Sequence, residues 1–97
     1  MYTQNEILDF LKHYYAKNKE RYHIKKIGIF GSYAKGKENE NSDIDIVVDL
    51  EKATMFGLIA IKEDIKEFFK TEVDIVQLRE RMNPLLKKRI EKEAIYV

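Results

Sequence analysis

The sequence predicts a small α/β (α+β) fold in which helices pack against a mixed β-sheet. Two observations predict it. Segments whose apolar residues recur at helical spacing alternate along the chain with short segments rich in β-branched and aromatic residues, which are typical of strands. The chain also has only 97 residues, so we expect a single domain over residues 1–97.

The first helix is predicted to run to about Arg21. Thr3 and Glu6 have the spacing of a capping box, in which each side chain bonds the backbone N–H of the other residue. The next segment, residues 24–30, predicts a strand because it is apolar and β-branched and ends at a glycine. Residues 31–42 then predict a turn, with at most one short helical turn, followed by a polar loop.

The second half of the chain repeats this alternation. We expect a strand over residues 43–50, a helix over 54–70, a strand over 72–78, a helix over 83–93 and a short strand or extended tail over 94–97. Thr54 is a suitable cap for the first of these helices, and Asn83 followed by Pro84 is a typical helix start. Four side chains of the 54–70 helix are expected in the core: Met55, Phe56, Phe68 and Phe69.

The composition excludes several classes of protein. Eighteen basic residues balance seventeen acidic ones, so we expect no strong nucleic-acid binding. Cysteine is absent, which excludes disulfides, zinc–thiolate sites and a cysteine nucleophile. No apolar run is long enough for a membrane span and no signal peptide is visible, so we expect a cytoplasmic protein without a membrane partner.

A Gly-Ser pair ends the first predicted strand. Without a side chain at Gly31, backbone N–H groups can approach a phosphate, and Ser32 adds a hydroxyl donor. Lys35 could offset the charge of a triphosphate or simply be solvated. Residues 31–37 also match the first seven positions of a P-loop, but Glu38 stands where the P-loop needs Ser or Thr, and no helix is predicted to follow. We therefore prefer a phosphate-binding turn of another kind.

Two aspartates begin the second predicted strand. Asp43 and Asp45 are two positions apart, so in a strand their side chains point to the same face. Carboxylate oxygens are ligands that magnesium prefers. A pair of solvent-facing aspartates at a strand start is the plainer explanation for such a short motif.

A third aspartate makes the metal site more credible. Asp74 stands in an otherwise apolar strand, where a carboxylate is costly to bury without a partner. If that strand neighbours the strand of Asp43, the three carboxylates can converge and bind two metal ions, an arrangement used for phosphoryl and nucleotidyl transfer. Alternatively, Asp74 lies on an edge strand and reaches water.

Taken together, Gly31-Ser32, the gap of ten residues and Asp43-x-Asp45 resemble the nucleotidyltransferase superfamily that includes DNA polymerase β. The short chain resembles its minimal branch, the MNT domains, which are often encoded beside a HEPN toxin as a toxin–antitoxin pair. The resemblance implies a polymerase β-like core in which Gly31, Ser32 and Lys35 bind the nucleotide. It also implies that Asp43, Asp45 and Asp74 are catalytic and bind magnesium, with two ions expected. Many relatives carry arginine at the position of Lys35.

The resemblance further implies an antitoxin that moves AMP from ATP to a tyrosine hydroxyl of a partner HEPN ribonuclease. Two alternatives stay open: an antitoxin that inhibits its partner by binding alone, and a nucleotidyltransferase that modifies a small molecule such as an aminoglycoside. Tyr33, next to the turn, could contact the nucleotide or face water.

Overall fold

The computed structural model describes residues 2–39, 41–52 and 54–97. Its elements follow the predicted order. They are α1 (Gln4–Asn18), β1 (Ile24–Phe30), α2 (Ser32–Lys35), β2 (Ile44–Leu50), α3 (Met55–Phe69), β3 (Val73–Gln77), α4 (Pro84–Glu93) and β4 (Ile95–Tyr96). No helix within these described ranges is both long enough and apolar enough to cross a membrane.

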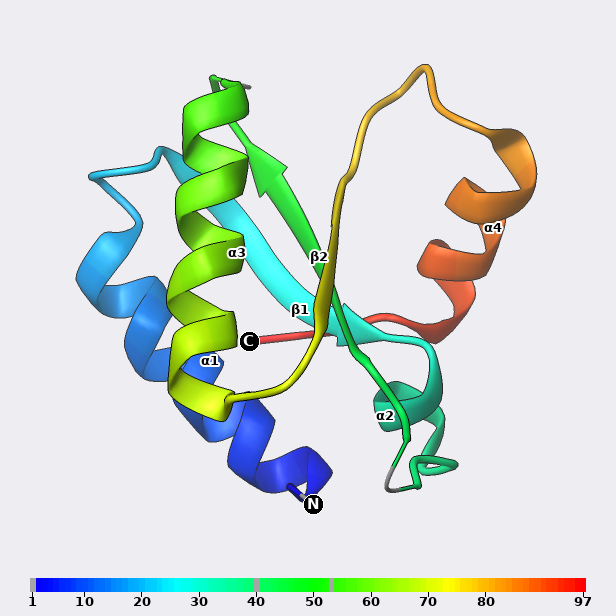
Figure 1. The fold of residues 1–97 in the computed structure, drawn as a ribbon. Helices are drawn as coiled ribbons and strands as arrows, with labels where there is room; N and C mark the ends of the chain where they lie inside the picture. Colours follow the sequence, from blue (N-terminus) through cyan, green and yellow to red (C-terminus); the bar gives the residue numbers. More distant parts are fainter. Residues whose placement is uncertain (1, 40, 53) are drawn as a thin grey trace.

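The strands form one mixed sheet in the order β3-β2-β1-β4. β1 is antiparallel to β2 and β4, whereas β2 is parallel to β3. A parallel pair needs a long crossover connection, and α3 provides it. Figure 1 shows α1 and α3 side by side, with α4 apart from them on the other side of the strands. The predicted small mixed sheet with helices packed against it is therefore confirmed.

The face of the sheet below α1 and α3 carries the main core. Side chains at alternate positions of β2, including Ile44, Ile46 and Val48, point to this face and are fully buried. From the helices, Leu11 of α1 and Ile65 of α3 are equally buried in the same cluster. Burial of this kind is the main favourable contribution to the fold.

The opposite face is only partly covered. Phe30, Val47 and Ile90 form a second, smaller core where α4 packs on the sheet. Asp45 belongs to this face, because its side chain alternates with those of Ile44 and Ile46 along β2. One short helix cannot cover a whole sheet face, so the ends of β2 and β3 that carry aspartates stay partly accessible.

The predicted helix starts are confirmed. The N–H of Glu6 donates to Thr3 Oγ1 at 3.1 Å, and the N–H of Thr3 donates to Glu6 Oε1 at 3.0 Å. Thr54 caps α3 by accepting from the N–H of Gly57 at 3.0 Å. Asn83 caps α4, with Pro84 in its first turn.

Two predictions about the helices were wrong. α1 ends at Asn18 instead of Arg21, because the chain turns there and passes through His23 with a left-handed backbone, φ 55°. Three of the four core candidates of α3 are exposed: Met55 is 72% exposed, Phe56 88% and Phe68 57%. Only the stripe containing Ile61, Ile65 and Phe69, four residues apart, reaches the sheet, and the exposed side chains lie off that stripe.

Candidate active site

The chain turns sharply after β1. Gly31 has φ 72° and ψ −147°, a backbone conformation that is essentially restricted to glycine. α2 follows at once and is a single turn, because Gly36 ends it in the left-handed region at φ 71° and ψ 25°. The predicted turn with one short helical turn is confirmed. Since the helix stops there, this segment does not continue into the helix that a P-loop requires.

A side chain at the start of α1 forms hydrogen bonds with this turn. Gln4 Nε2 donates to the carbonyl oxygens of Tyr33, at 2.8 Å, and Ala34, at 3.2 Å. Tyr33 is 3% exposed and belongs to the main core, so its ring does not face water. Ser32 is half-buried and Lys35 is exposed, which leaves both able to meet a ligand.

Asp45 lies directly against the turn. A Cβ atom added to Gly31 would stand 2.2 Å from Oδ2 of Asp45 and 3.1 Å from its Cγ. The Asp45 carboxylate thus occupies the space that a side chain at position 31 would need, so only glycine fits there. The register of the sheet fixes this proximity, because Phe30, the residue before Gly31, pairs with Asp45 between β1 and β2.

The parallel pairing of β2 and β3 brings a second aspartate to the same place. Asp74 is the direct register partner of Asp45. Asp43 precedes Asp45 by two positions and lies just before the first residue of β2, Ile44. We refer to Asp43, Asp45 and Asp74 as the three-aspartate site. The condition set in the sequence analysis, that the two strands are neighbours, is met.

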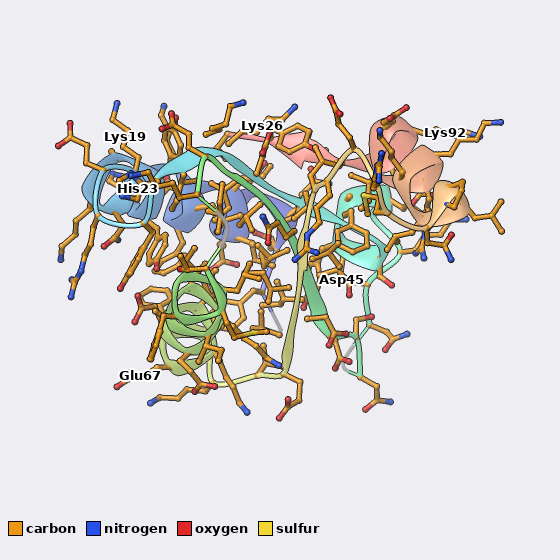
Figure 2. All side chains as sticks on the ribbon, turned by 90° about the horizontal axis from the view of Figure 1, so that it is seen from above. Lys19, His23, Lys26, Asp45, Glu67 and Lys92 are labelled. Carbon is orange, nitrogen blue, oxygen red and sulfur yellow. The ribbon has the colours of Figure 1, made fainter. Side chains whose placement is uncertain are left out.

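The three-aspartate site carries excess negative charge. Burial raises the pKa of Asp45 above its ordinary value; the negative charges of Asp74 and Asp43 add to this shift, and the positive charge of Arg89 opposes it. Asp45 is the half-buried member, whereas Asp43 and Asp74 are exposed. Figure 2 shows Asp45 on the side of the strands that faces α2, away from α3.

The arrangement of these carboxylates is not that of a closed metal centre. Within residues 2–39, 41–52 and 54–97, no group of three or more His, Cys, Asp or Glu side chains is arranged to hold a metal ion. The donor chemistry nevertheless fits a hard divalent cation, since the site supplies carboxylate oxygens from one strand face and has a surplus of negative charge. Burial is the main reason that the pKa of Asp45 is raised, and a bound cation would offset the added repulsion from Asp74 and Asp43.

The sequence analysis did not identify two residues that lie beside the site. Glu93 accepts from Lys35 Nζ at 2.9 Å and from Arg89 Nε at 3.2 Å, so it links α2 to α4. The hydrogen bond from Lys35 is the main reason that the pKa of Glu93 lies below its ordinary value. Arg89 and Glu93 are four residues apart on a helix, which predicts an ion pair, but the sequence does not show that α4 lies beside the site.

Comparison with known proteins identifies the family of the chain. The family model "Polymerase beta, Nucleotidyltransferase" matches residues 9–97. The protein adenylyltransferase MntA of Thermococcus cleftensis is 32% identical over 98 aligned positions, covering 100% of this chain and 98% of that protein.

Two crystal structures share the fold. One is a toxin–antitoxin with AMP-PNP, with a TM-score of 0.71 and 22% identity, covering 98% of this chain and 72% of that one. The other is a tri-AMPylated HEPN toxin of Shewanella oneidensis in complex with an MNT antitoxin. It has a TM-score of 0.71 and 19% identity, and the match covers 97% of this chain and 71% of that one. With the family match over nearly the whole sequence, these likenesses lead to one conclusion: the chain belongs to the polymerase β nucleotidyltransferase family.

Proposed function

We propose that this protein is an antitoxin that transfers AMP from ATP to a tyrosine hydroxyl of a partner HEPN ribonuclease toxin and so silences it. The observation that carries the proposal is the juxtaposition of the Gly31 turn with Asp45 and Asp74 in a member of a nucleotidyltransferase family. The full-length likeness to an MntA adenylyltransferase supports AMP as the transferred group. The fold shared with an MNT antitoxin bound to an AMPylated HEPN toxin supports the partner.

In this reaction the acceptor oxygen forms a bond to the α-phosphorus of ATP. The bond from that phosphorus to the bridging oxygen breaks, and pyrophosphate leaves with the electron pair. Gly31 and Ser32 bind the triphosphate through backbone N–H and hydroxyl donors, and Lys35 balances part of its charge. A carboxylate oxygen of Asp74 takes the proton of the acceptor hydroxyl.

Asp43, Asp45 and Asp74 would hold magnesium, with two ions expected. When bound, magnesium supplies charge neutralisation on the triphosphate and lowers the pKa of the attacking hydroxyl. The pairing of Asp45 with Asp74 in the sheet, which puts two negative charges side by side, supports this assignment.

The acceptor is expected to come on another molecule. The described part of the chain consists of one sheet and its helices, which we take to be a single minimal domain, so it offers no separate unit for holding an acceptor. An exposed apolar patch is available for contact with a partner: Met55, Phe56 and Ile59 in the first turns of α3 are 72%, 88% and 52% exposed.

The same patch favours a second candidate, an antitoxin that acts by binding alone. In Figure 1 the start of α3 lies at the top of the molecule, whereas α2 and the beginning of β2 lie at the bottom. The patch is therefore far from the three-aspartate site, and a partner could be held there without any chemistry at Asp45.

One experiment separates the candidates. The protein is incubated with ATP labelled on the α-phosphate, magnesium and the HEPN protein encoded beside it. Label should appear on the partner with wild type, vanish with Asp45→Asn, and persist with Asp49→Asn. Asp49 is the matched control because it lies on the same face of β2 at its other end.

Three results would contradict the proposed function. Full protection of cells by the Asp43→Ala/Asp45→Ala protein would show that binding suffices and would overturn the proposal. Label on an aminoglycoside but not on the protein partner would favour a small-molecule acceptor. If millimolar magnesium with ATP fails to raise the thermal midpoint of the wild-type protein, the nucleotide site itself is in doubt.

A further inference from the structure

The carboxylate of Glu93, the last residue of α4, is enclosed by two cations from different helices. Its Oε1 lies 2.9 Å from Lys35 Nζ and its Oε2 lies 3.2 Å from Arg89 Nε. The Glu93 side chain is only 16% exposed, whereas those of Lys35 and Arg89 are 40% and 50% exposed. A covered carboxylate needs such partners. In return, it fixes the two cations relative to each other.

Both cations lie beside the three-aspartate site. Lys35 ends α2, the helical turn that begins at Ser32. The guanidinium carbon of Arg89 is 5.9 Å from the ring centre of Phe30, which pairs with Asp45 in the sheet. Yet among the described residues Arg89 makes an ion pair within 4.0 Å only with Glu93.

Glu93 uses only part of the hydrogen-bonding capacity of each cation. A guanidinium has five N–H donors, and the contact through Nε leaves both terminal amino groups of Arg89 for another acceptor. An ammonium has three donors, of which Glu93 needs one. Both cationic side chains are about half exposed, so their remaining donors can meet a ligand at the open face of the sheet.

We propose that Arg89 and Lys35 together bind the triphosphate of the nucleotide, and that Glu93 is the positioning residue that sets their spacing. The inference rests on the proposed function, because it concerns the substrate of the same site. A guanidinium binds phosphate oxygens in pairs, whereas an ammonium acts as a compact point charge. Arg89 thus supplies from α4 the two-pronged contact that Lys35 cannot make from α2.

A purely structural role for Glu93 is the competing explanation. As a link between α2 and α4, Glu93 would stabilise the fold, and its loss would lower the thermal midpoint without selectively affecting the nucleotide. ATP affinity of the folded protein separates the two explanations. It is measured by titration calorimetry at a temperature where every variant remains folded, without a partner and with magnesium present.

We expect Arg89→Ala to weaken ATP binding about tenfold, as for loss of one charge-assisted contact. Glu93→Gln should weaken ATP binding several-fold. Lys35→Arg should bind ATP as wild type does, whereas Lys35→Met should bind it more weakly. The matched controls are Lys92→Ala and Glu91→Gln, exposed residues of the same helix with the same change in charge. Figure 2 shows Lys92 extending away from Asp45 at the far end of the molecule.

The test also separates this inference from the proposed function. If Arg89→Ala and Glu93→Gln bind ATP as their controls do, the inference is overturned even where wild type labels its partner. If wild type binds ATP with the expected pattern but never labels a partner, the proposed acceptor is wrong and the inference stands. Where labelling occurs, Arg89→Ala should raise the KM for ATP about tenfold with kcat within about twofold.

Discussion

Replacing Gly31 by alanine tests how closely the turn and the three-aspartate site are built together. Two costs follow from the structure. Alanine at φ 72° and ψ −147° is strained by about 1–3 kcal/mol. Its Cβ would also meet Oδ2 of Asp45 at 2.2 Å, so that side chain must leave its rotamer at a cost of about 0.5–1.5 kcal/mol. We expect Gly31→Ala to lower the free energy of unfolding by about 1.5–4.5 kcal/mol.

The matched control is Gly36→Ala, measured by urea unfolding beside Gly31→Ala. Gly36 has nearly the same φ, 71°, but nothing lies within 4 Å of the position of its Cβ. Gly36→Ala should lower the free energy of unfolding by about 1–2 kcal/mol, the usual cost of a left-handed alanine. A double variant isolates the contact itself: with Asp45→Ala the nearest atom of that residue is its Cβ, at an ordinary 3.4 Å.

The effects of Gly31→Ala and Asp45→Ala on the free energy of unfolding should therefore not add, and the double variant should be more stable than their sum predicts by about 0.5–1.5 kcal/mol. Strict additivity, or a loss from Gly31→Ala no larger than that from Gly36→Ala, would refute the reasoning. In that case the close approach of Asp45 to the turn would not be what requires glycine.

Three further outcomes follow from charges and hydrogen bonds. Asp45→Asn should raise the free energy of unfolding by about 0.2–1 kcal/mol in metal-free buffer, because like charges opposed on neighbouring strands repel, and chemical denaturation shows whether it does. Glu93 has a pKa below its ordinary 4.5, so its stabilising effect is present above pH 4.5 and lost as the pH falls through the folded-state value. The gap in thermal midpoint between wild type and Glu93→Gln should close in acid, and a constant gap would contradict the ion-pair role. Tyr14→Phe removes the hydroxyl that donates to Asp64 at 2.7 Å and should cost about 1 kcal/mol of stability while leaving ATP affinity unchanged, as calorimetry can establish.

Local signals in the sequence were enough to predict most of the fold. Thr3, Thr54 and Asn83 each offer a side-chain oxygen where a helix begins, and each makes the expected bond. Such contacts join residues only a few positions apart, so a single sequence contains what is needed to predict them. The left-handed turn at His23 has no comparable signal, which is why the end of α1 was placed too late.

Contacts between segments that are far apart in the sequence could not be predicted in the same way. The aspartates were visible as candidates, but the pairing of Asp45 with Asp74 depends on β2 and β3 being neighbours, and the sequence offered this only as a condition. The sequence analysis did not single out Glu93 or Arg89, because nothing local indicates that their helix meets Lys35. Phe56 was wrongly predicted to lie in the core because its side chain is apolar. Only the orientation of α3 in the structure shows that Phe56 faces outward.

The crossover from β2 through α3 to β3 has a consequence for when activity can arise. Pairings between segments remote in sequence form slowly, because the loop between them must close before their contacts compensate for its entropy. Asp45 meets Asp74 only after α3 has docked, and Lys35 meets Glu93 only when almost the whole chain is in place. A partly synthesised chain that has not reached α4 therefore lacks the assembled site. On the proposed function, transfer of AMP should therefore appear during translation no earlier than completion of the final helix.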